Sequence, residues 1–146
     1  MTSPRVWLSL YVLIGAAFLG VTTPSLAQRG KPHQIVFELT SETPEHWEAL
    51  LNNIENVQKA LGKESTEVEV VAHGKGLALL KNTSTAKNRL ATIAKTGVRF
   101  VACENTMRRQ HVKKEDLVPE AGTVDSGVAE VVRKQEAGWS YVRSGS

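Results

Sequence analysis

Short apolar segments that alternate with helix-like segments are the feature that most limits how this chain can fold. Residues 34–39 form a nearly continuous apolar run of strand length, and further strand-like runs recur at residues 67–73, 98–102, 122–124 and 139–142. A strand without polar alternation is typical of a sheet that is covered on both faces. Strand–helix alternation favours parallel strands, and right-handed crossovers place helices on both faces. The sequence therefore predicts an α/β fold with five strands.

The helical segments between these runs are indicated by caps and by apolar spacing. The clearest has Thr43 as N-cap and Pro44 at the first helical position, and its apolar residues recur every three or four positions until Gly62. Further helices are expected after Ser84 or Thr85, at about residues 105–111, and after Asp125 or Ser126. The last of these should carry Val128, Val131 and Val132 on one side.

The first 27 residues have the pattern of an export signal. Arg5 is followed by an almost wholly apolar segment at residues 6–21, and Ser25-Leu26-Ala27 offers small residues where a signal peptidase cleaves. The alternative is an uncleaved membrane anchor, but the apolar segment is short for a spanning helix. We expect cleavage after Ala27, a single domain at residues 28–146, and a periplasmic or secreted protein without a membrane attachment.

Composition excludes several classes of function. The 18 basic and 15 acidic residues leave a formal net charge of +3, and their interspersion gives no surface typical of nucleic-acid binding. The four histidines lack short ligand spacing and there is one cysteine, so neither a metal site nor a cofactor is expected. The sequence also lacks the Gly-x-Ser-x-Gly elbow of serine hydrolases and the Cys-x-x-Cys motif of thioredoxin-type oxidoreductases.

The lone cysteine, Cys103, is the main candidate for chemistry. It follows the strand predicted at residues 98–102 and precedes a helix, where backbone N–H groups and the helix dipole favour negative charge. An exported protein with one cysteine cannot form an internal disulfide. Cys103 is therefore a reactive thiol, a partner in an intermolecular bond, or a buried and inert side chain.

Other candidates follow from the rule that ligands gather at the carboxyl ends of parallel strands. His73 and Gly74, in the turn before Lys75-Gly76, and Asp125 are expected to line the same rim as Cys103. His73 is preferred over His111 as an acid–base partner. Asn105 and Thr106 are expected near the thiol as helix-start residues.

Two arginines in the helix after Cys103 are candidates for holding an anionic sulfur species. Arg108 and Arg109 lie one to two turns along that helix, and we expect them to point away from its amino end.

The mature chain resembles the DsrE/DsrF-like (YchN-like) family, and is most similar to its exported branch. The resemblance covers nearly all of residues 34–143 and is carried by the order and spacing of four segments. These are Val-Ala-His-Gly at 71–74, Gly-Val-Arg-Phe-Val-Ala-Cys at 97–103, Ala-Cys-Glu-Asn-Thr-Met at 102–107, and Gln-Glu-Ala-Gly-Trp-Ser-Tyr-Val at 135–142.

The resemblance implies a three-layer α/β/α sandwich with a mostly parallel five-stranded sheet, assembled into a trimer or hexamer. It also implies that Cys103 carries persulfide sulfur, as in cytoplasmic sulfur-relay members. The chain differs from those members in its export signal and in having no second thiol. Trp139 and Tyr141 share one face of the last predicted strand and are expected to pack against another subunit.

Two functions stay open at this stage. The first is a sulfur carrier, at most sulfurtransferase-like, in which Cys103 passes persulfide sulfur between a donor and an acceptor protein. The second is a non-catalytic oligomer with a structural or small-ligand-binding role and an inert Cys103. Accessibility of the native thiol to an alkylating reagent distinguishes the two.

Overall fold

The computed structural model describes residues 32–144 of the chain. The expected signal peptide at residues 1–27, its cleavage point after Ala27 and the start of the mature chain lie outside the described residues. The strands and helices are β1 (His33–Leu39), α1 (Pro44–Leu61), β2 (Thr66–Ala72), α2 (Lys87–Ala94), β3 (Arg99–Cys103), α3 (Glu104–Arg109), β4 (Ala121–Val124), α4 (Gly127–Glu136) and β5 (Ser140–Ser144).

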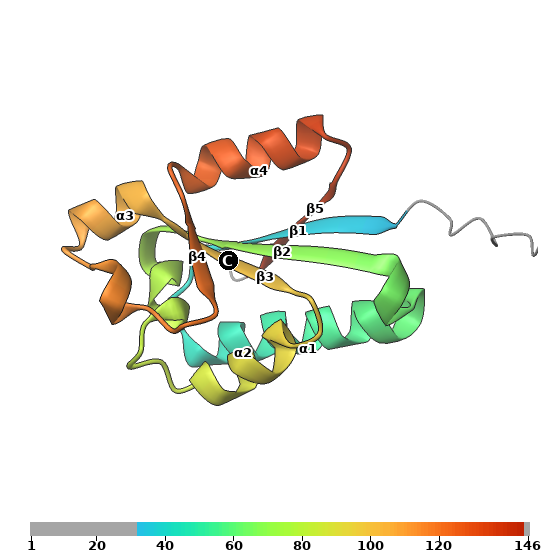
Figure 1. The fold of residues 1–146 in the computed structure, drawn as a ribbon, viewed down its shortest axis with the longest axis horizontal. Coiled ribbons are helices and arrows are strands. Elements are labelled where there is room, and N and C mark those ends of the chain that lie inside the picture. Colours follow the sequence, from blue (N-terminus) through green and yellow to red (C-terminus); the bar gives the residue numbers. More distant parts are fainter. Residues whose placement is uncertain (1–31, 145–146) are drawn as a thin grey trace, which may run out of the picture.

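The five strands form one sheet in the order β4-β3-β2-β1-β5, and every neighbouring pair is parallel. Helices α1 and α2 cover one face and α4 crosses the other, while α3 lies at the end of the sheet (Figure 1). The predicted α/β class and three-layer arrangement are confirmed, and the sheet is wholly rather than mostly parallel.

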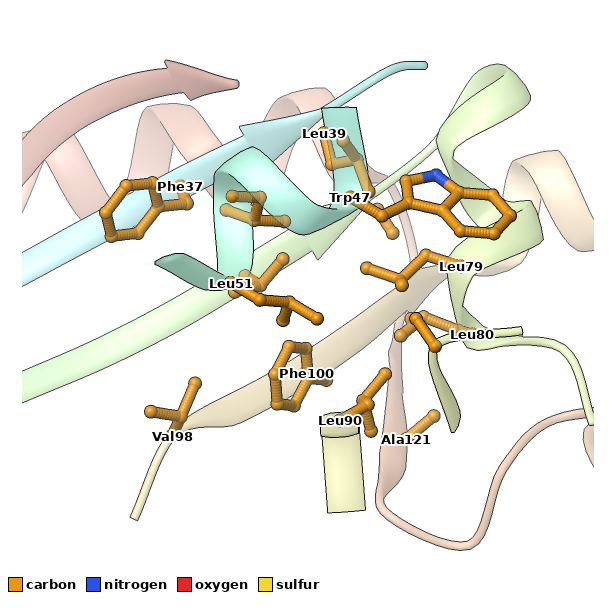
Figure 2. Packing of buried hydrophobic residues seen from close by; sticks show 14 of the residues in the cluster. Phe37, Leu39, Trp47, Leu51, Leu79, Leu80, Leu90, Val98, Phe100 and Ala121 are labelled. Carbon is orange, nitrogen blue, oxygen red and sulfur yellow. The ribbon is translucent and has the colours of Figure 1, made fainter. Parts of the chain in front are cut away.

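The face beneath α1 and α2 holds the main hydrophobic core. Alternate strand residues such as Phe37, Leu39 and Phe100 point into it, where they meet Leu51 of α1 and Leu90 of α2 (Figure 2). Burying each such side chain contributes about 1.5–3 kcal/mol. Helix α1 begins at Pro44 as predicted, and Gly62 ends it with a φ of 88° that favours glycine.

The opposite face is more polar. A small apolar cluster of Val36, Val71, Val101, Val131 and Trp139 packs beneath α4. Charged side chains of the strands also point towards this face, among them Glu38 and the fully buried Glu69.

The connection after β2 depends on a glycine, and the start of α2 differs from the sequence prediction. Residues 74–80 after β2 form a 3-10 helix, and a Cβ at Gly76 would lie 2.2 Å from the backbone oxygen of Leu39, so only glycine allows this close approach. The next helix begins at Lys87 with Ala86 as N-cap. Ser84, expected as a cap, is buried, and its hydroxyl accepts a hydrogen bond from the Ala86 N–H at 3.3 Å.

The last helix and strand also correct two expectations. Val131 of α4 is buried, whereas Val128 and Val132, predicted on the same side, are 59% and 47% exposed. Trp139 precedes β5 and packs within this chain, where the Lys134 Nζ lies 4.0 Å from the ring centroid. Its burial is therefore accounted for by α4 and the sheet, without a second subunit.

Within residues 32–144, none of the helices is both long and apolar enough to cross a membrane.

Candidate functional site

A hollow of about 460 Å³ lies at the carboxyl ends of β2 and β3, and we call it the Cys103 pocket. Cys103 is the last residue of β3, and α3 begins at the next residue, so the predicted strand-to-helix switch is present. The pocket is lined by His73, Cys103, Asn105, Thr106, Arg108, Arg109, Ser126 and Val128. A second hollow of about 530 Å³, between α2 and the β3–β4 edge, contains none of the predicted site residues.

Gly127, the first residue of α4, brings two of these side chains together. A Cβ at this position would lie 2.9 Å from the Cβ of His73 and 3.2 Å from the Cβ of Cys103. Both distances are shorter than ordinary carbon contacts, so a larger residue would displace one side chain or the other. Because Gly127 has no side chain, the Cβ atoms of His73 and Cys103 can both lie within a few ångströms of this position.

The environment of Cys103 favours the thiolate. The residue is 4% exposed, and burial by itself raises the pKa of a thiol. The Thr106 hydroxyl and the backbone N–H groups of Gly127, Thr106 and Asn105 outweigh burial, so that the pKa of Cys103 is lowered. Since the side chain of Cys103 forms no regular capping hydrogen bond, these N–H groups act on the sulfur as oriented dipoles.

Thr106 links the β2 turn to the thiol. Its side chain is almost wholly buried, and its Oγ1 accepts a hydrogen bond of 3.0 Å from the Gly74 N–H. Gly74 also accepts a hydrogen bond of 2.8 Å from the Gln110 side chain through its carbonyl oxygen. Gly74 itself does not line the pocket, but its N–H holds the Thr106 hydroxyl, which lowers the pKa of Cys103.

The Glu38 carboxylate holds the imidazole ring of His73. Its Nε2 lies 2.7 Å from the Glu38 Oε1, and the two side chains are 17% and 16% exposed. The other carboxylate oxygen of Glu38 accepts a hydrogen bond from the Tyr141 hydroxyl. Burial works against ionisation of Glu38, but the hydrogen bonds from Tyr141 and His73 outweigh it and lower the pKa of the carboxyl.

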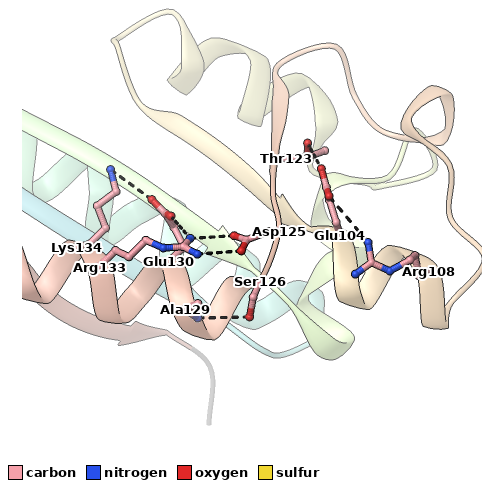
Figure 3. Close-up of polar contacts among 9 residues, drawn as sticks. All are labelled: Glu104, Arg108, Thr123, Asp125, Ser126, Ala129, Glu130, Arg133 and Lys134. Atoms are coloured by element: carbon pink, nitrogen blue, oxygen red, sulfur yellow. Dashed lines mark hydrogen bonds and ion pairs between the residues drawn. The ribbon is translucent and has the colours of Figure 1, made fainter.

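Two arginines, Arg108 and Arg109, line the pocket. The Arg108 guanidinium turns back toward the start of α3, which corrects the expectation that it points away. The Arg108 guanidinium donates to the Asn105 side chain. It also lies 4.0 Å from the Glu104 carboxylate (Figure 3). Arg109 carries a second positive charge at the pocket, and a guanidinium is a suitable partner for an anion.

Two predicted candidates lie elsewhere. Asp125 is directed along α4 and pairs with both terminal nitrogens of Arg133 at 2.8 Å (Figure 3). The hydrogen bonds from Arg133 lower the pKa of Asp125 to about 2. The helix cap in this turn is Ser126, whose Oγ accepts from the Ala129 N–H at 3.4 Å. His111 follows α3 with a φ of 53° and is absent from the pocket lining.

Sequence reasoning did not identify Glu38, Gly127, Ser126 or Val128 as residues of the site. Glu38 left a visible signal, because it is a charged residue inside the apolar run at residues 34–39. Gly127 and Val128 left none, since their role depends on how α4 crosses β2 and β3. Among the residues that the structure describes, no group of three or more His, Cys, Asp or Glu side chains is placed to hold a metal ion.

Comparison with known proteins places this architecture in a family. The model of the DsrE/DsrF-like family matches residues 34–143. A solved structure of a protein of unknown function from Methanobacterium thermoautotrophicum is 33% identical, with a TM-score of 0.73, and the match covers 76% of this chain and 98% of that one. No curated protein matches. On the extent of the family match and the shared fold, the chain belongs to the DsrE/DsrF-like family.

Proposed function

We propose that this protein is an exported sulfur carrier in which Cys103 holds persulfide sulfur for transfer to a partner. Membership of the DsrE/DsrF-like family supports a sulfur-relay type of fold. The observation that carries the proposal is the Cys103 pocket, where a thiol of lowered pKa lies beside Arg108 and Arg109. A thiolate is the nucleophile that sulfur transfer requires, and the arginines favour an anionic substrate.

The proposed step is thiol–persulfide exchange. The Cys103 thiolate attacks the outer sulfur of a donor persulfide, a new S–S bond forms at Cys103, and the donor S–S bond breaks. The donor leaves as a thiolate, so the exchange is redox-neutral and needs no oxidant. Since the sequence contains no second thiol, the sulfur must leave to a thiolate on another molecule.

The test is intact mass measurement after incubation with a low-molecular-weight persulfide. The wild-type protein should gain the mass of one sulfur atom, and a reducing agent should remove it. Cys103→Ser should gain nothing, and Arg109→Gln should react more slowly because the pocket loses a positive charge. An unmodified wild-type protein, in a sample where a free control thiol reacts, would refute the carrier function.

The small exposed fraction of Cys103 favours the second candidate, a non-catalytic oligomer with a structural or small-ligand-binding role and an inert thiol. This role predicts that iodoacetamide labels the protein only after unfolding. Labelling of the native protein within minutes at neutral pH would exclude it. A labelled native protein that takes up no sulfur would instead leave ligand binding as the role of the pocket.

Export and assembly belong to the same proposal. Amino-terminal sequencing of protein recovered from the producing cells should find Gln28 as the first residue if cleavage follows Ala27. We expect a homo-oligomer, a trimer or hexamer, and Val128 and Val132, two exposed apolar side chains one helical turn apart on α4, support self-association without fixing the subunit number. Light scattering of the purified protein measures the subunit number, and a monomer at all concentrations would contradict the assembly.

A further inference from the structure

The packing of the sheet does not require the chain of hydrogen bonds that joins Tyr141, Glu38 and His73. It runs from β5 through β1 to the end of β2 and stops at the Cys103 pocket. Glu38 lies in a strand whose neighbours Phe37 and Leu39 are almost wholly buried. Placing a carboxylate there costs desolvation, and an apolar residue would fill the position without that cost.

Hydrogen-bond chemistry decides which ring nitrogen of His73 carries the proton. The lowered pKa of Glu38 keeps its carboxylate ionised, and an ionised carboxylate only accepts hydrogen bonds. The Nε2 atom, 2.7 Å from that carboxylate, must therefore be protonated. In the neutral ring the lone pair is then on Nδ1, which has no hydrogen-bond partner among the described residues.

The charges that surround Glu38 reinforce this arrangement. Tyr141 donates to the carboxylate oxygen that His73 does not use, so both oxygens have a donor. Arg143, opposite Glu38 in the β1–β5 pairing, adds a favourable positive charge. With both oxygens occupied, the carboxylate is held in one orientation, and so is the imidazole that it binds.

We infer that Glu38, held by Tyr141, is a positioning residue that keeps His73 protonated at Nε2 and makes Nδ1 the proton acceptor of the Cys103 pocket. The inference rests on the proposed function and deepens it. His73 and Cys103 line the same pocket, and their Cβ atoms lie 2.9 Å and 3.2 Å from the point where a Cβ at Gly127 would be. In the proposed step Nδ1 takes the proton from the Cys103 thiol, and the thiolate then attacks the donor persulfide. The proton on Nδ1 passes to the departing donor thiolate, so that protons and electrons balance without a further reactant.

The closing experiment measures alkylation of Cys103 by iodoacetamide at pH 7, which depends on thiolate formation and needs no persulfide. His73→Gln and Glu38→Gln should each slow labelling about five- to tenfold. Tyr141→Phe should slow it about twofold, because Glu38 keeps its bond to His73. Glu67→Gln is the matched control, since Glu67 lies on the same sheet face and bonds Gln34 rather than His73; its rate should be unchanged.

A double-mutant cycle shows whether Glu38 acts through His73. Glu38→Gln combined with His73→Gln should label no more slowly than His73→Gln alone. If the slowing in the double variant is the product of the slowing in the two single variants, the inference is overturned. A wild-type labelling rate in either single variant would also overturn it. Because sulfur uptake is not measured, a protein that fails the persulfide test can still pass this one, and the reverse holds as well.

A spectroscopic measurement keeps the inference testable if a variant fails to fold. Long-range nitrogen–proton NMR of the wild-type protein, at a pH where the ring is neutral, should show His73 as the Nε2–H form. A predominant Nδ1–H form would overturn the inference regardless of the labelling rates.

Discussion

The two faces of the sheet are made from the same strands but differ in what they bury. The face beneath α1 and α2 holds aliphatic and aromatic side chains that pack against two helices and the 3-10 helix at residues 74–80. The face beneath α4 holds a small valine cluster and several buried or half-buried charged side chains. The first face supplies most of the hydrophobic stabilisation, and the second carries the groups that can react.

The charged side chains on the α4 face are of two kinds. Glu69 is fully buried, lies 3.0 Å from the Lys134 Nζ, and also pairs with Arg99. Neither of its oxygens forms a regular hydrogen bond, and burial outweighs the two cations, so its pKa is raised. Glu38 by contrast is fully hydrogen-bonded, and its pKa is lowered. The ion pair of Glu69 ties α4 to the sheet, whereas Glu38 serves the pocket.

The largest expected effect is a loss of stability on the apolar face. Leu51→Ala should lower the free energy of unfolding by about 3–4 kcal/mol, because it leaves a cavity in a fully packed region. Urea denaturation measures the loss. Leu61→Ala, at an exposed position of the same helix, should cost less than about 1 kcal/mol. If native Leu51→Ala protein labelled at Cys103 much more slowly than wild type, the separation between the two faces would be wrong.

The next effect should come from the buried ion pair. Lys134→Ala removes one partner of Glu69 and a cation over Trp139, and should lower the free energy of unfolding by about 3 kcal/mol at pH 7. The loss should shrink as the pH falls through the raised pKa of Glu69, because a protonated carboxyl no longer needs the cation. Urea denaturation across this range measures the trend, and a loss that grows towards acid pH would contradict it.

A smaller effect on stability, with a clear effect on the site, is expected at Gly127. Gly127→Ala should push His73 and Cys103 apart, slow iodoacetamide labelling several-fold, and cost about 1–2 kcal/mol. Gly122→Ala is the matched control, because its added Cβ makes an ordinary contact of 3.7 Å with Val101. Equal labelling rates in the two variants would mean that Gly127 does not set the geometry of the pocket.

The smallest effect is expected at Asp125. Asp125→Asn breaks an exposed pair with Arg133, which water and salt already screen, and Asp125 does not line the Cys103 pocket. Its labelling rate and its denaturation midpoint at pH 7 should both match the wild type. A slowed labelling rate would place Asp125 in the site, where the sequence expectation had put it.

The described fold was largely predictable because its signals are local. The apolar runs predict the strands, and Pro44 and Gly62 bound α1 within a residue. The misplaced start of α2 has a local explanation as well, since Ser84 bonds an N–H outside the helix. The burial of Trp139 within this chain was not predicted, because the packing of α4 over the sheet cannot be derived from the two-residue period of a strand.

The sequence by itself determined the class of fold, the position of Cys103 between a strand and a helix, and the placement of His73 at the same rim. Only the tertiary structure decided which side chains meet there. It brought Gly127 between His73 and Cys103, bound Glu38 to His73, and turned Asp125 towards Arg133. The reason is physical: alternation of elements sets chain direction, but contacts between distant residues depend on crossing angles and strand register, which no local pattern encodes.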